Sequence, residues 1–195
     1  MSAQDERKMR LFKKFGYDIG KAREFILRKA DLAEGRILEI GTGMGHMTIA
    51  LMKKGFSPVT IDLNKEMQKK ARVNIGAMAL KNKATLKIMD AEDLSFKDNS
   101  FDTVVSVNFI HHASDPLKCV REMARVTRRG LVIADINKKG ERIMEKVHKM
   151  EGQTHPRAKV SMSAMKELLE WLGLDVRSYR DTCQTVLVAQ KEERP

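Results

Sequence analysis

Short apolar runs alternate with amphipathic, helix-like runs from about residue 21 to the end of the chain. This alternation is typical of βαβ units around a mainly parallel sheet. The last two apolar runs are separated by too few residues for a crossover, so they must pair as an antiparallel hairpin. The sequence therefore predicts an α/β fold, a seven-stranded mainly parallel sheet with helices on both faces and a C-terminal antiparallel hairpin. The expected strands are 36–40, 58–62, 85–89, 101–107, 130–135, 174–181 and 185–190.

Several of the intervening helices have recognisable ends. Asp115 is a good N-cap with proline directly after it, and Gly130 is expected to follow the last turn of that helix. Ser163 is expected to cap the helix that precedes the hairpin. Asn64 is expected to begin a helix that runs towards Leu80.

Two basic segments, residues 1–20 and 136–160, fall outside the alternation and flank the expected carboxyl ends of strands. We therefore expect substrate-side structure there, with His148 and His155 as candidate contacts. The formal charge of +11 favours an anionic small-molecule acceptor. Nucleic acid remains open but is less favoured, because aromatic residues do not interleave with the charges as single-strand binders require.

The length of 195 residues suits one domain, spanning 1–195. No apolar run approaches the roughly 20 residues of a membrane helix, and the first residues are charged where a signal peptide is apolar. We therefore expect a cytoplasmic chain without membrane insertion, and the oligomeric state stays open. Cys119 and Cys183 have no neighbouring cysteine or clustered metal ligand, so neither a disulfide framework nor a zinc site is predicted.

The most informative stretch is RILEIGTGMGHMTIALMKKG, in which an apolar strand runs into a glycine loop and then a helix. Glycines at 41, 43 and 45 let the backbone turn sharply and approach a ligand closely. The loop predicts a nucleotide-cofactor site, and a tight strand-to-helix turn without a ligand is the alternative. Asp62 ends the next strand, where a carboxylate can accept hydrogen bonds from both ribose hydroxyls.

A dinucleotide-binding loop would have its third glycine at position 46, which is His46 here, and this argues against NAD. With Glu39 two residues before Gly41, the loop resembles the first motif of class I S-adenosylmethionine-dependent methyltransferases. Residues 89–116, MDAEDLSFKDNSFDTVVSVNFIHHASDP, resemble the corresponding segment of the small methyltransferases of ubiquinone and menaquinone biosynthesis. The resemblance extends from about residue 21 to residue 129.

This resemblance implies a Rossmann-like methyltransferase fold, S-adenosylmethionine as cofactor, and methyl transfer to a small or medium-sized acceptor. It also implies the cofactor-binding residues. These are Glu39, Gly41 and Gly43 for the methionine part, Asp62 for the ribose, Asp90 and the Ala91 amide for the adenine, Leu63 against the adenine ring, and Asn108 with Phe109 near the methionine end and the incoming nucleophile.

Methyl transfer from a sulfonium depends mainly on holding donor and acceptor together, so no fixed catalytic dyad is expected. His111 is the candidate general base, beside His112, and a structural role for it in the loop is equally open. No metal is expected, because Asn108 stands where metal-dependent relatives have a carboxylate. Two other readings remain. One is a cofactor-binding partner or RNA-associated module without small-molecule activity. The other is a nicotinamide-dependent oxidoreductase, supported only by the glycine loop and Asp62.

Overall fold

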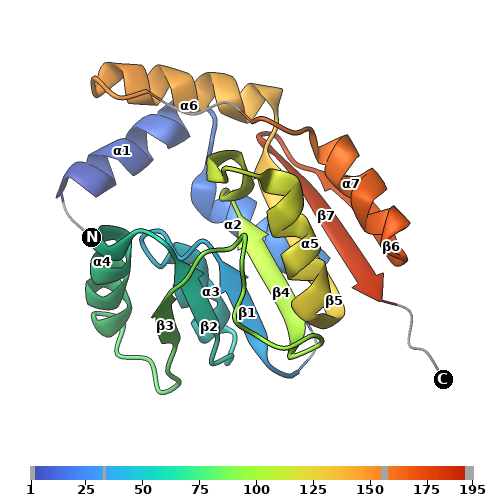
Figure 1. Ribbon diagram of the computed structural model, residues 1–195. Helices are drawn as coiled ribbons and strands as arrows, with labels where there is room; N and C mark the ends of the chain where they lie inside the picture. The colour runs from blue at the N-terminus through green and yellow to red at the C-terminus, as the bar shows by residue number, and fades with distance from the viewer. Residues whose placement is uncertain (1–2, 33, 155–157, 192–195) are drawn as a thin grey trace.

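The computed structural model describes residues 3–32, 34–154 and 158–191 of the chain. Its centre is a seven-stranded sheet in the order β3-β2-β1-β4-β5-β7-β6, with helices on both faces (Figure 1). The strands are β1 (Ile37–Ile40), β2 (Val59–Asp62), β3 (Thr85–Ile88), β4 (Phe101–Val107), β5 (Thr127–Ile136), β6 (Leu174–Arg180) and β7 (Gln184–Lys191). The helices are α1 (Ala3–Lys14), α2 (Ile19–Ala30), α3 (His46–Lys53), α4 (Lys65–Gly76), α5 (Pro116–Val126), α6 (Lys138–Met150) and α7 (Met162–Trp171), with a 3₁₀ turn, η1, at Ile110–His112.

The predicted strands and their pairing are confirmed. The strands β1 to β5 run parallel, whereas β7 pairs antiparallel with both β5 and β6. The predicted C-terminal hairpin therefore sits at one edge of the sheet, with its second strand inserted against β5. All parallel strands consequently end at the same edge, which is where a ligand-binding crevice forms in such sheets.

Three predicted helix ends are wrong. The helix α5 ends at Val126 and does not extend to Gly130, because Thr127 is already extended and pairs with Phe101 of β4. The cap of α7 is Ser161, whose hydroxyl accepts a hydrogen bond from the amide of Ala164, and not Ser163.

The helix α4 begins after the predicted cap, Asn64, but ends at Gly76, short of the expected Leu80. The sequence therefore predicted each of these helices, but it placed one end of each a few residues away from the observed position.

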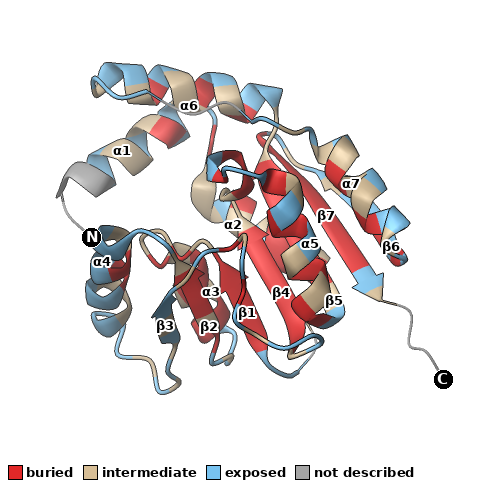
Figure 2. Ribbon diagram, viewed as in Figure 1, coloured by how far each residue is buried: buried red, intermediate tan, exposed pale blue. Residues whose placement is uncertain are grey.

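The central strands are buried on both faces, as their near-continuous apolar sequences require (Figure 2). Side chains alternate between faces along a strand, so neighbours enter different layers. Val104 of β4 belongs to the apolar cluster that includes α5 and α7, and Val105 belongs to the cluster that includes α2 and α3. Burial in two layers holds the strand ends, and with them the loops that follow, in one arrangement.

Within the two basic segments, which fall outside the alternation in the sequence, residues 3–14 and 138–150 form the regular helices α1 and α6. The helices α1 and α6 lie side by side above the carboxyl ends of the strands (Figure 1). Phe12 of α1 belongs to the same apolar cluster as Val147 of α6. Its ring packs edge-on against that of His148, with 6.3 Å between the ring centroids. At the far end, the ammonium of Lys8 pairs with Glu151 at 2.9 Å. Among the described helices, none has the length and apolar character that a membrane crossing needs.

Candidate functional site

The loop after β1 is held against β2 by its backbone. The amides of Gly41 and Thr42 both donate to the carbonyl of Ile61, each at 2.9 Å. Gly41 has a φ of +85°, and a Cβ built on it would lie 2.6 Å from the Cβ of Phe109. Only glycine satisfies both the left-handed backbone and this close approach. The loop therefore passes the end of β4 without a side chain between them.

Two cavities adjoin at Gly41. The first, which we call the Glu39 cavity, has a volume of about 210 Å³. The second, the Asp62 cavity, has a volume of about 270 Å³. All nine residues that the sequence assigned to the cofactor line these cavities, including Phe109 in the second. Glu39, Gly41, Gly43 and Asn108 line the first, and Gly41, Asp62, Leu63, Asp90 and Ala91 line the second.

Glu39 is almost fully buried at the floor of its cavity, with 1% of its surface exposed. Burial raises the pKa of its carboxyl to about 7, and hydrogen bonds from Thr48 and Thr60 offset part of this effect. The hydroxyl of Thr48 donates to Glu39 at 2.5 Å. Arg23 of α2 lines the same cavity, and burial lowers the pKa of its guanidinium. The cavity thus offers an acidic and a basic group, which suits the two charged ends of an amino acid.

Asp62 accepts two backbone hydrogen bonds. Its carboxylate accepts from the amide of Gly43 and from the amide of Asn64, each at 2.8 Å. Asn64 in turn caps α4 through its own side chain. Asp62 therefore holds the glycine loop in place as well as facing the cavity, a role that the sequence did not indicate. Each carboxylate oxygen keeps a further lone pair that can accept from a hydroxyl.

The rest of the Asp62 cavity combines a polar turn with apolar surface. The carboxylate of Asp90 accepts from the amide of Glu92 at 2.8 Å, and Ala91 behind it is buried. Leu63 is 63% exposed although it is a large apolar residue. An exposed leucine beside a cavity gains free energy when a flat apolar ring covers it. This arrangement suits a purine base.

At the end of β4, Asn108 joins a network that the sequence analysis missed. Its side-chain amide donates to the hydroxyl of Tyr17 at 3.1 Å. The side-chain amide of Gln184, from β7, donates to Tyr17 at 2.7 Å and to the carbonyl oxygen of Asn108 at 2.8 Å. Burial raises the pKa of Tyr17, so it stays a neutral phenol. Segment 1–20, which contains Tyr17, was expected on the substrate side, whereas no sequence signal marked Gln184.

His111 lies beside these cavities, buried against β5. Its ring Nδ1 is 2.6 Å from the Oδ1 of Asp135, and its backbone amide donates to the Oδ2 at 3.1 Å. Both side chains are almost completely buried, with 2% and 3% of their surfaces exposed. His112 lines the Asp62 cavity, and burial together with the adjacent His111 lowers its pKa to about 4. His111 therefore ties the loop after β4 to β5, and His112 is the neutral imidazole that faces the cavity.

The second basic segment contains the two histidines that were predicted as substrate contacts. His148 packs on the ring of Phe12 and is half-buried, and burial lowers its pKa. It belongs to the contact between α1 and α6. His155 lies outside the described residues.

Comparison with known proteins gives a consistent picture. Residues 38–134 match the family model described as a methyltransferase domain. The chain is 33% identical over 127 residues to a phosphatidylethanolamine N-methyltransferase of Cereibacter sphaeroides, covering 63% of this chain and 62% of the relative. It is 27% identical over 118 residues to a ubiquinone biosynthesis O-methyltransferase of Xanthomonas oryzae pv. oryzae, covering 59% of this chain and 48% of the relative. The matched region thus spans less than two thirds of either relative.

The fold also has close counterparts among solved structures. The crystal structure of the YcgJ protein of Bacillus subtilis aligns with a TM-score of 0.72 at 19% sequence identity, covering 90% of this chain and 100% of that one. At this identity the likeness concerns the fold alone.

Proposed function

Because this chain belongs to the class I S-adenosylmethionine-dependent methyltransferases, by its matched domain model and by its fold, we propose that it transfers the methyl group of S-adenosylmethionine to a small or medium-sized acceptor. One observation carries this proposal. The nine residues assigned to the cofactor from the sequence come from the ends of four strands, and they line two adjoining cavities.

The lining of the two cavities fits the two halves of this cofactor. We propose that Glu39 and Arg23 hold the ammonium and carboxylate of the methionine part. Asp62 would accept from the ribose hydroxyls, while Leu63 and Ala91 would enclose the adenine. When bound, the cofactor supplies an activated methyl carbon, which bonds to the acceptor's lone pair as its bond to sulfur breaks, the electron pair staying on sulfur and the acceptor releasing one proton.

The acceptor would approach from beneath α1 and α6. These helices cover the carboxyl edge of the sheet (Figure 1). Asn108 and Gln184 line the Glu39 cavity, and both bond Tyr17, which follows α1 in the chain. We propose that this network positions the acceptor, because its neutral donors and acceptors can orient a nucleophile without a metal. The many basic side chains of the two helices support an anionic acceptor.

The burial of His111 favours a positioning role over direct proton transfer. We propose that the pair with Asp135 fixes the loop that carries Asn108, while His111 itself stays away from the acceptor in this conformation. A general base in direct contact would need a solvent- or cavity-facing nitrogen, a position that His112 comes nearer to.

Residues 1–195 are proposed to act as one domain, because α1 packs into a cluster shared with α6 and with Cys183 in the turn of the hairpin. A cytoplasmic location is also proposed. It is supported by the two free cysteines, which are both buried thiols, and fractionation of cells that express a tagged chain would test it.

Calorimetric titration with S-adenosylhomocysteine, S-adenosylmethionine and NAD tests the cofactor. We expect the first two to bind and NAD to show no heat of binding. Transfer of labelled methyl groups to a panel of amines, phenols, carboxylic acids and RNA then separates an enzyme from a cofactor-binding partner. Titration of Asp62→Ala with S-adenosylhomocysteine tests the ribose contact. Asp93→Ala is its matched control, because Asp93 is an exposed carboxylate outside both cavities. Binding of NAD in preference to S-adenosylhomocysteine would refute the proposal.

A further inference from the structure

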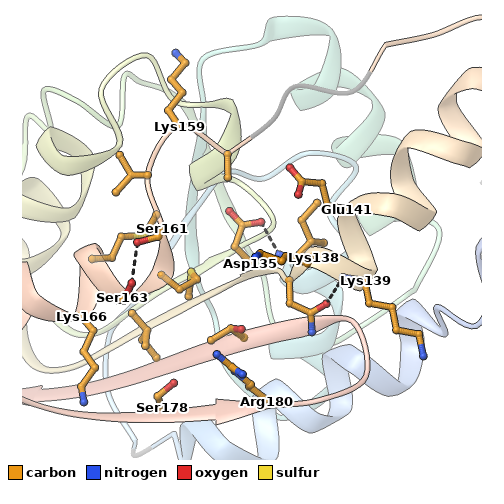
Figure 3. Close-up of a pocket in the computed structure, with 18 residues that line it drawn as sticks. Asp135, Lys138, Lys139, Glu141, Lys159, Ser161, Ser163, Lys166, Ser178 and Arg180 are labelled. Carbon is orange, nitrogen blue, oxygen red and sulfur yellow. Dashed lines mark hydrogen bonds between the residues drawn. The ribbon is translucent and has the colours of Figure 1, made fainter.

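A third and larger cavity lies beyond the carboxyl end of β5. It has a volume of about 840 Å³, within the range of small-molecule sites. We call it the Asp135 cavity. It is bounded by the end of β5, the first turn of α6, residues 158–163, the first turns of α7, and facing residues of β6 and β7 (Figure 3). None of the residues assigned to the cofactor lines it.

The rim of this cavity is cationic. Its lining includes five basic and two acidic side chains, namely Lys138, Lys139, Lys159, Lys166 and Arg180 against Asp135 and Glu141. Lys139 and Arg180 are exposed and form no ion pair within the described parts of the chain. Lys166 pairs with Glu170 at 3.4 Å, and Lys159 donates to the carbonyl oxygens of Ala113 and Ser114. Lys139, Lys159 and Lys166 extend outward around the cavity in Figure 3.

Helix ends and hydroxyl groups add to this preference for an anion. The first turns of α6 and α7 both line the cavity, so the positive ends of two helix dipoles face it. Three serines of the lining, Ser161, Ser163 and Ser178, are exposed. Several charged and neutral donors that converge from separate segments suit a multiply charged anion such as phosphate better than a single carboxylate.

Two carboxylates lie among these basic groups, at Asp135 and Glu141. Asp135 is buried and Glu141 is half-buried, and Figure 3 labels both near Lys138. The carboxylate of Asp135 already accepts from the amide of Ile136 at 2.8 Å and lies against His111. Glu141 is half-buried and its carboxylate has no hydrogen bond or ion pair to the described residues. A partly desolvated carboxylate without a counterion favours a cation beside it.

Asp135 also lies near residues that line the Glu39 cavity. Asp135 pairs with Thr185 across β5 and β7, and the following pair is Ile136 with Gln184. On the other side of β5, the amide of Asn108 donates to the carbonyl of Ala134 at 2.8 Å. Asp135 is therefore one residue along β5 from Ile136, which pairs with Gln184, and one residue from Ala134, which bonds Asn108.

We infer that the Asp135 cavity binds the methyl acceptor, and that this acceptor is an aminoalkyl phosphate whose ammonium lies beside Glu141 and whose phosphate is held at the rim. The inference rests on the proposed methyltransferase function and adds the acceptor's site and chemical class. An ammonium between Glu141 and Asp135 places the amine at the end of β5, which is the part of the cavity nearest to Asn108 and Gln184. The amine nitrogen is then the nucleophile, and the proton that it releases passes to water.

Calorimetry with S-adenosylhomocysteine present tests this with three soluble probes. Phosphoethanolamine carries both groups, glycerol 3-phosphate lacks the amine, and ethanolamine lacks the phosphate. We expect phosphoethanolamine to bind at least about tenfold more tightly than either of the others, because each half then contributes more than about 1.4 kcal/mol. Vesicles that contain phosphatidylethanolamine, compared with phosphatidylcholine alone, distinguish a lipid headgroup from a free phosphate ester as the source.

Two variants separate the two ends of the site. Lys139→Gln with Arg180→Gln should weaken both phosphate probes by about tenfold, as expected when two charge-assisted contacts are lost. Glu141→Gln should reduce phosphoethanolamine binding to the level of glycerol 3-phosphate and leave the latter unchanged. The matched control is Lys53→Gln with Lys54→Gln, which removes the same charge from exposed positions at the end of α3. Affinity for S-adenosylhomocysteine should not change in any of them.

Three results would overturn the inference. Phosphoethanolamine could bind no better than glycerol 3-phosphate, Glu141→Gln could leave its affinity unchanged, or the control pair could weaken binding as much as the cavity pair. A parent chain that fails to bind S-adenosylhomocysteine would instead refute the proposed function. The probe titrations, repeated without that ligand, would still decide whether the cavity binds an aminoalkyl phosphate.

Discussion

The buried carboxyl of Glu39 makes the stability of the cofactor-free chain depend on pH. Its pKa is raised from 4.5 to about 7, mainly by burial. Between these two values the native state retains a proton that the unfolded state has lost. The free energy of unfolding therefore falls as pH rises from 4.5 to about 7, and stays constant above that. This gap corresponds to about 3 kcal/mol, at 1.36 kcal/mol for each pKa unit.

Replacing the carboxyl with an amide removes this titration. Glu39→Gln keeps the shape of the side chain and an oxygen that can accept from Thr48, so the variant should fold. At pH 8 its free energy of unfolding should exceed that of the parent by up to about 3 kcal/mol, and at pH 4 the two should agree within about 0.5 kcal/mol. The same change should weaken S-adenosylhomocysteine by about tenfold or more, because a charged hydrogen-bond partner is lost.

Urea unfolding followed by circular dichroism from pH 4 to pH 9 measures the first effect, and calorimetry measures the second. Glu66→Gln is the matched control. Glu66 is exposed on α4, and its hydrogen bond with Lys69 lowers its pKa, so the control should shift stability slightly in the opposite direction. Parallel pH profiles of parent and Glu39→Gln would refute the buried, protonated carboxyl. Unchanged cofactor affinity would remove Glu39 from the cofactor site.

Three further predictions concern the loop and its support. Asp62→Ala should weaken the binding of S-adenosylhomocysteine by about 1–3 kcal/mol in calorimetry, with Asp93→Ala as the unaffected control. An unchanged Kd in a folded variant would exclude Asp62 from the cofactor site. Gly41→Ala should lower the free energy of unfolding by about 2–4 kcal/mol, since it combines a left-handed φ with a clash against Phe109; a parent-like urea midpoint would contradict this. Arg125→Gln should lower the free energy of unfolding by about 1–2 kcal/mol, because Arg125 bonds the segment before β4 to α5. Cofactor affinity should not change, and a reduced affinity would show that these bonds also position the cofactor site.

Local signals explain why so much of the fold was predictable. Asp115 and Asn64 cap α5 and α4 as expected, because an N-cap bonds amides only two or three residues ahead. Where local signals compete, the sequence could not choose between them. Ser161 and Ser163 are both good caps and bond each other at 2.8 Å, and the contacts of the folded chain place Ser161 at the cap.

The cofactor residues were predictable for a related reason. Most of them lie at or just after the ends of strands β1, β2, β3 and β4, and parallel strands all end at one edge of the sheet. A residue such as Asp62 could therefore be assigned to that edge from its position in the chain alone. Its hydrogen bond to Gly43 could not, because it depends on how the loop after β1 crosses the end of β2.

Only the tertiary structure placed the groups that meet across distant segments. Tyr17, Asn108 and Gln184 come together because β7 lies against β5 and the turn before α2 reaches over the sheet edge. The strand-like runs alone do not specify that order. The partner of His111, Asp135, and the cavity beside it follow from the same order of strands. The sequence by itself determined the elements and the edge at which a cofactor binds, because periodicity and capping act within a few residues. Contacts between segments far apart in the chain depend on packing, and they decided which side chains complete the site.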